Sequence, residues 1–155
     1  MIDTSILRDV ELFAGLDALH LAHLASIGEE RQLAKNEILF EEGAHDTALF
    51  VVVEGAIRIS KIVPGIGEEA LAILGPSSYF GEMEFIDRDL SRAARALGHE
   101  RSRLYAFDYR ALDDLLGTDR ELALAIYASM TRTLARRLRA TNDKVTAMFA
   151  MAQFG

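Results

Sequence analysis

A glycine, a glutamate and an arginine lie close together in the middle of this 155-residue sequence, within residues 80–96. Gly81 allows the backbone to approach a ligand closely, and the free amides of a helix that starts there attract an anion. Arg92 lies ten residues after Glu82 and can close on the same anion with two charge-assisted hydrogen bonds. The Glu82 carboxylate is suited to accept from a sugar hydroxyl. These residues predict a small phosphate site.

Short apolar segments and glycine-containing turns surround this site. The run Pro64-Gly65-Ile66-Gly67 is a strong turn signal, and residues 56–60 alternate in the manner of a half-buried strand. The expected strands cover residues 38–42, 49–53, 56–60, 69–74, 93–97 and 103–107. Many short strands between glycine turns predict a jelly roll or a barrel.

Helical patterns precede and follow the strands. Asp17 is a suitable N-cap, and the residues after it with helical spacing are Leu21, Leu24, Ala25 and Gly28. The pattern becomes helical again at Asp108, and residues 118–121, with Thr118 as N-cap, fit a capping box that would begin another helix. No glycine or proline follows until Gly155, which predicts a helix of about thirty residues, roughly 45 Å long.

This last helix carries a heptad pattern. Its apolar and small residues recur at alternating spacings of three and four: Leu124, Tyr127, Thr131, Leu134, Leu138, Thr141, Val145, Met148 and Ala152. A small β-roll cannot cover a helix of this length, and pairing with a second copy of the chain is the simplest way to bury the seam. The methionine-bearing end after Met148 is either the end of this coiled coil or a face for a protein partner.

The run from Phe-Gly-Glu at 80–82 through a hydrophobic stretch and a loop to Arg-Ala-Ala at 92–94 resembles the phosphate-binding cassette of the cyclic-nucleotide-binding domain family. That family includes bacterial catabolite activators, regulatory subunits of cAMP-dependent kinase and cyclic-nucleotide-gated channels. The resemblance covers residues 12–148, and the spacing of Glu82 and Arg92 is similar to that of the bacterial activators. It implies an α+β fold, in which an eight-stranded antiparallel β-roll (a jelly roll, or double-stranded β-helix) is flanked by N-terminal helices and a long C-terminal helix.

We therefore expect a single domain over residues 1–155. The N-terminal helices would lie within residues 1–35 and the β-roll within 36–108, with the phosphate-binding cassette at 80–94. The C-terminal helices, which carry the dimerisation seam, would occupy residues 109–155.

The resemblance also implies a role for each site residue. Arg92 would pair with an equatorial or axial oxygen of the cyclic phosphate, and Glu82 would accept from the ribose 2′-hydroxyl. The backbone around the phosphate would come from Gly81, Met83, Glu84 and Ala93. The contacts to the purine base would come, one from each subunit, from Thr141 and Asn142.

Glu84 departs from the family pattern, which has a small residue beside the phosphate. A carboxylate close to an anion lowers affinity unless it turns outward or pairs with a cation. Arg88 and Arg95 are candidate partners. A sharper hypothesis is that Glu84 folds inward and forms a salt bridge with Arg92, so that the protein itself occupies the site.

The expected ligand is cyclic AMP, with cyclic GMP as the alternative, and no other cofactor is expected. Ala93 stands where channel-type discrimination uses a threonine, which favours cyclic AMP without separating the two nucleotides. Signalling would pass through rearrangement of the last helix to an effector protein that the sequence does not identify. The chain stops at Gly155 without the helix-turn-helix domain of the activators, so direct DNA binding is not expected.

Composition limits the remaining classes of protein. The formal net charge of −7 disfavours general binding to nucleic-acid phosphates, and the excess of basic residues within 121–155 is typical of a solvated helix face. The sequence has no cysteine. His20 and His23 share a helix face with a spacing that could bind metal, but no histidine pair or carboxylate on a strand completes a ligand set, so no metal site is expected. The sequence shows no membrane span, signal peptide or set of nucleophile and base. We therefore expect a cytoplasmic protein that is not an enzyme.

Two other regulatory functions stay open. A degenerate domain that kept the fold but lost the ligand would act as a dimeric protein-interaction module. Glu84 favours that alternative, whereas intact Gly81, Glu82 and Arg92 favour binding. A truncated transcription factor is disfavoured by the missing DNA-reading module and by the acidic body of the chain.

Overall fold

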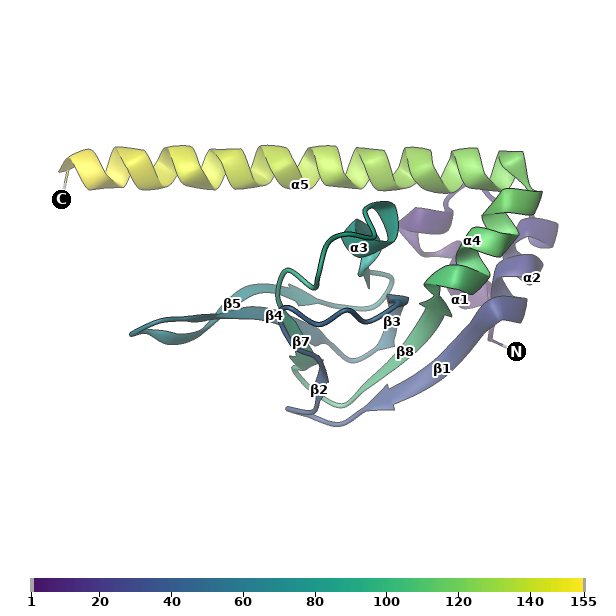
Figure 1. The fold of residues 1–155 in the computed structure, drawn as a ribbon, viewed down its shortest axis with the longest axis horizontal. Coiled ribbons are helices and arrows are strands. Elements are labelled where there is room, and N and C mark those ends of the chain that lie inside the picture. The colour runs from purple at the N-terminus through teal and green to yellow at the C-terminus, as the bar shows by residue number, and fades with distance from the viewer. Residues whose placement is uncertain (1, 155) are drawn as a thin grey trace.

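In the computed structural model, which describes residues 2–154, eight strands form two four-stranded sheets (Figure 1). The strands are β1 (Gly28–Leu33), β2 (Ile38–Phe40), β3 (Ala48–Glu54), β4 (Ile57–Val63), β5 (Gly67–Leu74), β6 (Tyr79–Phe80), β7 (Arg95–Gly98) and β8 (Ser102–Asp108). The sheet orders are β1-β8-β3-β6 and β2-β7-β4-β5, and all neighbouring strands pair antiparallel. The predicted eight-stranded antiparallel jelly roll is confirmed.

Most of the helices gather at one end of the roll, and the last one runs along the length of the molecule (Figure 1). The helices are α1 (Thr4–Arg8), the 3-10 helix η1 (Glu11–Phe13), α2 (Ala18–Ile27), α3 (Glu82–Ile86), α4 (Tyr109–Thr118) and α5 (Arg120–Phe154). The side chain of Asp17 accepts from the amide of His20 at 2.8 Å, so the predicted N-cap of α2 is confirmed. Within residues 2–154, no helix has the length and apolar character that a membrane crossing requires.

Strand β3 separates two hydrophobic cores. Successive side chains of a strand point to opposite faces, and in β3 both faces are buried. Leu49 and Val51 face the helices, while Phe50 and Val52 fill the space between the two sheets. The nearly continuous apolar sequence of β3 follows from this position, because neither face meets water.

The prediction that Gly28 belongs to an N-terminal helix is wrong. Helix α2 ends at Ile27, and Gly28 begins β1, which pairs with β8 at the edge of its sheet. A Cβ atom on Gly28 would lie 2.5 Å from Cδ1 of Ile2 and 3.0 Å from the ring of Phe107, so a larger residue would require these side chains to shift. The edge strand is largely exposed, with Leu33 as its buried residue, and therefore lacks the apolar alternation that would have predicted it.

The start of the last helix also differs from the prediction. Thr118 ends α4, and its hydroxyl donates to the carbonyl oxygen of Leu115. The carboxylate of Asp119 instead accepts from the amide of Leu122 at 3.0 Å, so Asp119 caps α5. Asp119 alone separates α4 from α5. Because the two helical patterns follow each other so closely in the sequence, the boundary between them could not be placed from the sequence.

Helix α5 has buried residues only along its first part. Leu122, Ile126 and Met130 are buried among the residues of the helix-side core. Every residue from 135 to 154 is exposed, and this part of the helix passes along the β4–β5 side of the roll, with only its end beyond the hairpin (Figure 1). Leu138 and Met148 of the predicted heptad seam are exposed in the single chain. The long helix is therefore confirmed, and its pairing with a second copy stays a prediction.

Candidate functional site

Gly81 forms the corner between strand β6 and helix α3. Its φ angle is +89°, in the left-handed region that favours glycine. A Cβ atom at this position would lie 2.8 Å from Nη1 of Arg92 and 2.9 Å from the carbonyl oxygen of Ala48. The glycine is thus required both by the backbone conformation and by the close approach of the arginine.

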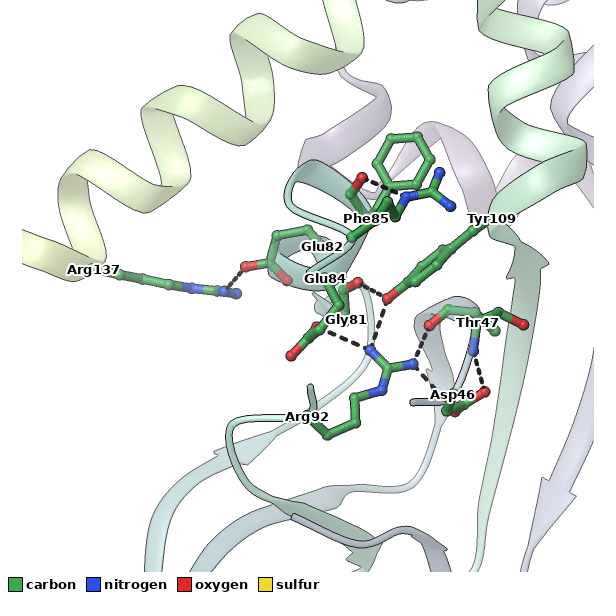
Figure 2. Close-up of polar contacts among 11 residues, drawn as sticks. Asp46, Thr47, Gly81, Glu82, Glu84, Phe85, Arg92, Tyr109 and Arg137 are labelled. Carbon is green, nitrogen blue, oxygen red and sulfur yellow. Dashed lines mark hydrogen bonds and ion pairs between the residues drawn. The ribbon is translucent and has the colours of Figure 1, made fainter. Parts of the chain in front are cut away.

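The Arg92 side chain is 1% exposed and lies between Glu84 and Asp46 (Figure 2). Its Nη1 donates to Oε2 of Glu84 at 3.0 Å and to the hydroxyl of Tyr109 at 2.8 Å. Its Nη2 donates to Oδ2 of Asp46 at 3.1 Å and to the carbonyl oxygen of Ala48 at 2.6 Å. A buried charge is tolerated when it is paired and hydrogen-bonded, so these four acceptors hold the guanidinium in place.

The backbone and the ring of a neighbour also position Arg92. Its amide donates to the carbonyl oxygen of Ala44, and its own carbonyl oxygen accepts from the amide of Gly43, both at 2.8 Å. The guanidinium carbon lies 4.3 Å from the ring centroid of Phe40, within the range of a cation–π interaction. Among the described residues, the buried Nε of Arg92 has no hydrogen-bond partner. One strong donor is therefore unused in an otherwise saturated group.

Glu84 points inward from α3 and is buried. The hypothesis that it forms a salt bridge with Arg92 is confirmed by the 3.0 Å contact. The other candidate partners, Arg88 and Arg95, pair with different acids. The carboxylate thus lies beside the phosphate position that the family resemblance predicts.

Glu82 connects α3 to α5. Arg137 of α5 donates from Nη1 to Oε1 of Glu82 (Figure 2). Its Nη2 donates to the carbonyl oxygen of Tyr79 at 3.2 Å. Burial raises the pKa of the Glu82 carboxyl, the charge of Arg137 lowers it in part, and the nearby carboxylate of Glu84 raises it further. The predicted hydroxyl acceptor is therefore occupied by a side chain of the last helix.

Tyr109 connects Arg92 to the C-terminal helices. Its hydroxyl accepts from Arg92 and donates to the carbonyl oxygen of Gly81. Burial raises the pKa of this hydroxyl to about 12, so it keeps the proton that it donates. Ring centroids lie 5.5 Å apart between Phe85 and Tyr109, and 6.2 Å apart between Phe85 and Tyr127 of α5. A continuous row of contacts thus runs from the arginine to α5.

A cavity of about 360 Å³ opens beside these residues, which is a suitable size for a small molecule. Strands of the roll supply an apolar wall, α3 and the loop before β7 supply a polar end, and α5 supplies a third side. The lining residues are Phe40, Ile59, Leu71, Ala72, Leu74, Phe80, Gly81, Glu82, Met83, Glu84, Arg92, Ala93, Ala94, Arg137, Ala140, Thr141 and Lys144.

The cavity brings together most of the site residues predicted from the sequence. Those that line it are Gly81, Glu82, Met83, Glu84, Arg92, Ala93 and Thr141. Asn142 is exposed and is not among the lining residues of its own chain. Because the resemblance assigns one base contact to each subunit, the role of Asn142 stays a prediction about the dimer.

The sequence analysis did not identify two pairs of residues at the site. Arg137 and Lys144 line the cavity four residues before and three residues after Thr141, so helical spacing from Thr141 would have found them. Asp46 and Tyr109 are 46 and 17 residues from Arg92 in the sequence and meet it only in the folded chain. No local signal marks them.

The lining defines the chemistry that the cavity accepts. Arg92, Arg137 and Lys144 supply positive charge, and Glu82 and Glu84 supply carboxylates. An anionic group would be drawn to the arginines, hydroxyl groups to the carboxylates, and a flat apolar group to the wall formed by the strands. The arrangement is typical of a site for a small organic anion that carries hydroxyl groups.

Comparison with protein families assigns this arrangement to a class. Residues 30–119, more than half of the chain, match the family model of the cyclic nucleotide-binding domain. The chain therefore belongs to the cyclic-nucleotide-binding domain family, and the resemblance seen in the sequence is confirmed.

Two regulators and one solved domain illustrate the relationship. The Cyclic AMP receptor protein of Thermus thermophilus is 34% identical over 128 residues, which cover 83% of this chain and 57% of that protein. The CRP-like cAMP-activated global transcriptional regulator of Mycobacterium tuberculosis is 28% identical over 140 residues, which cover 90% of this chain and 60% of that protein. This chain thus spans about three fifths of the length of these relatives.

The solved structure supports the same fold. The N-terminal domain of a transcriptional regulator from Streptomyces coelicolor A3(2) is 34% identical and superimposes with a TM-score of 0.73. The match covers 90% of this chain and 94% of that chain. The similarity therefore extends over a whole domain of this class.

Proposed function

We propose that this chain is a regulatory domain that binds cyclic AMP, with cyclic GMP as the alternative ligand, and that signals to a partner protein through movement of α5. The observation that carries the proposal is Arg92, a buried guanidinium in the cavity lining that abuts Gly81 and whose Nε has no hydrogen-bond partner among residues 2–154. Family membership supports a cyclic nucleotide as the ligand class. The names of the two regulators favour cyclic AMP.

The geometry of the cavity suggests how the nucleotide would lie. Its cyclic phosphate would contact Arg92 and the backbone at Gly81, where no side chain interferes. The ribose 2′-hydroxyl would donate to Glu82, in competition with Arg137. The base would reach the apolar wall and Thr141, with Asn142 of the second subunit as the further contact.

The proposed movement follows from the two sides of the cavity. A nucleotide that touches both α3 and α5 would bind more tightly to one position of α5 than to another, and such differential affinity is what shifts a conformational equilibrium. The row of contacts through Tyr109, Phe85 and Tyr127 offers a second connection from the phosphate end to the same helix. The seam of α5 would pair with that of a second copy and present a changed surface to the effector.

Calorimetric titration of the intact chain with cyclic AMP and cyclic GMP tests the proposal. We expect micromolar or tighter binding of cyclic AMP and at least ~10-fold weaker binding by Arg92→Lys, because lysine keeps the charge but loses the two-point contact. Arg101→Lys is the matched control, since Arg101 is exposed and does not line the cavity. No heat with either nucleotide, in protein shown to be folded and free of ligand, would overturn the proposal.

A protein-interaction module without a ligand is the second candidate function. The contact of Glu84 with Arg92 favours it, because a carboxylate already satisfies part of the phosphate-binding group. Absence of nucleotide binding together with a stable dimer would select this function over the first.

A further inference from the structure

Four of the five N–H groups of Arg92 already have protein acceptors, and this saturation constrains how any anion can bind. Nη1 serves Glu84 and Tyr109, and Nη2 serves Asp46 and the carbonyl oxygen of Ala48. The Nε–H, which has no acceptor among residues 2–154, is parallel to an N–H of Nη2 rather than of Nη1. An anion that contacts Nη1 or Nη2 must therefore displace one of the four acceptors.

The cavity lining identifies which acceptor is displaced. Of the four acceptors that the described chain provides, Glu84 is the one whose residue lines the cavity. Asp46, Ala48 and Tyr109 hold the guanidinium from outside that lining. A ligand that enters from the cavity therefore meets the carboxylate of Glu84 before it meets the remaining partners.

We infer that Glu84 is an internal anion that competes with the ligand phosphate for Arg92 and thereby sets the affinity of the site. The inference rests on the proposed function and adds its regulation. Binding is an exchange in which the phosphate replaces the carboxylate on Nη1, Glu84 turns away from Arg92, and the contacts to Asp46 and Ala48 persist. A phosphate on Nη1 would add negative charge next to the Glu84 carboxylate, on a cation that already holds Asp46, so the chain responds only to ligand concentrations that overcome this competition.

Glu84→Ala and Glu84→Gln, measured by calorimetry with cyclic AMP, test the inference. Removal of the competing charge should tighten binding at least ~10-fold in Glu84→Ala, and Glu84→Gln should give a smaller gain because the amide oxygen still accepts from Arg92. Glu29→Ala is the matched control, since Glu29 is an exposed acid of β1 and does not line the cavity. Thermal unfolding of each variant shows that the protein measured is folded, and the near-isosteric glutamine keeps the test valid if the alanine variant does not fold.

Adenosine, which lacks the phosphate, separates competition from a general change in the cavity. The ratio of the affinities for cyclic AMP and adenosine should rise at least ~10-fold in Glu84→Ala. A crystal structure of the complex should show Glu84 turned away from Arg92, with Asp46 still in contact. Equal gains for both compounds, or no gain for cyclic AMP in a chain whose wild type binds it, would overturn the inference and leave the proposed function standing. No nucleotide binding by any folded variant would overturn both.

Discussion

The two sides of the cavity are held in opposite ways. On the α3 side, the 1% exposed side chain of Arg92 reaches acceptors on α3, α4, β3 and the loop before β3. On the α5 side, every residue from 135 to 154 is exposed, and Arg137 reaches Glu82 with a side chain that is 44% exposed. The Arg92 end of the cavity belongs to the folded interior, whereas the helix that completes the cavity lies on the surface of the protein.

This difference indicates which side a ligand can move. Segments with few buried contacts have the lowest local stability and supply the moving parts of switches. The distal part of α5 fits that description, because the buried residues of the helix end at Thr133. Arg92, by contrast, cannot shift without breaking contacts to several elements at once. We therefore expect substitutions on the α3 side to affect folding and those on the distal helix to affect assembly and coupling.

Arg92→Met should have the largest effect on folding. Removal of the cation leaves Glu84 and Asp46 without their partner in a partly or fully buried setting, and breaking a buried pair costs about 3–5 kcal/mol. Urea unfolding at neutral pH measures the loss. Arg101→Met, at an exposed position, should stay within about 0.5 kcal/mol of wild type. A loss below about 1 kcal/mol for Arg92→Met would contradict the view that this side is part of the folded interior.

Gly81→Ala should have the next largest effect, and Gly15→Ala is its matched control. Both glycines have positive φ angles, +89° and +80°, so each alanine carries the conformational cost of about 1 kcal/mol. The Cβ on residue 81 also collides with Arg92 and Ala48, whereas the one on residue 15 has no atom within 4 Å. Overpacking should raise the cost of Gly81→Ala to about 3 kcal/mol. Equal losses in the unfolding free energy would show that the close approach does not matter.

The sequence predicts six of the eight strands of the described chain and misses β1 and β6. Buried Ile57 begins β4, whose segment alternates, and β3 is apolar throughout because it divides two cores. Strand β1 is held to β8 by its backbone at a sheet edge, and β6 has only two residues. Backbone pairing leaves no side-chain pattern, so propensity and periodicity could not reveal these two strands.

The candidate site shows the same division. Gly81, Glu82 and Arg92 could be predicted because a short loop fixes their spacing in the sequence. Asp46 and Tyr109 belong to distant segments, and only the closure of the roll brings them to the guanidinium. The inward turn of Glu84 could be proposed from charge alone, but the choice among three arginines required the structure.

Met148→Glu tests the other side of the comparison through assembly. Met148 lies on the predicted seam, and Ala150, two residues further on, lies on another face of the helix. Both positions are exposed in the single chain, so neither Met148→Glu nor Ala150→Glu should change its unfolding free energy by more than about 0.5 kcal/mol. Sedimentation velocity over a concentration series should show at least ~10-fold weaker dimerisation for Met148→Glu, because a charge in a paired seam is costly. Equal dimerisation by the two variants would place the interface elsewhere.

Arg137→Gln should have the smallest effect, visible in the pH dependence of stability. Burial raises the pKa of Glu82 above its ordinary value of 4.5, and Arg137 limits the rise. A carboxyl whose pKa is raised on folding binds its proton more tightly in the folded state, so its contribution is most favourable at low pH and is lost as pH rises through the raised pKa.

Without Arg137 the pKa of Glu82 rises further, and the free energy of unfolding should fall more steeply than in wild type as pH rises above the ordinary carboxyl pKa of 4.5. Urea unfolding at several pH values measures the slope. Arg136→Gln is the control, because Arg136 pairs with Glu11 at an exposed position where ion pairs contribute little. Parallel pH profiles for all three proteins would show that the exposed Arg137 does not interact measurably with Glu82. The link between α5 and the cavity would then depend on the aromatic contact of Tyr127 with Phe85 rather than on this ion pair.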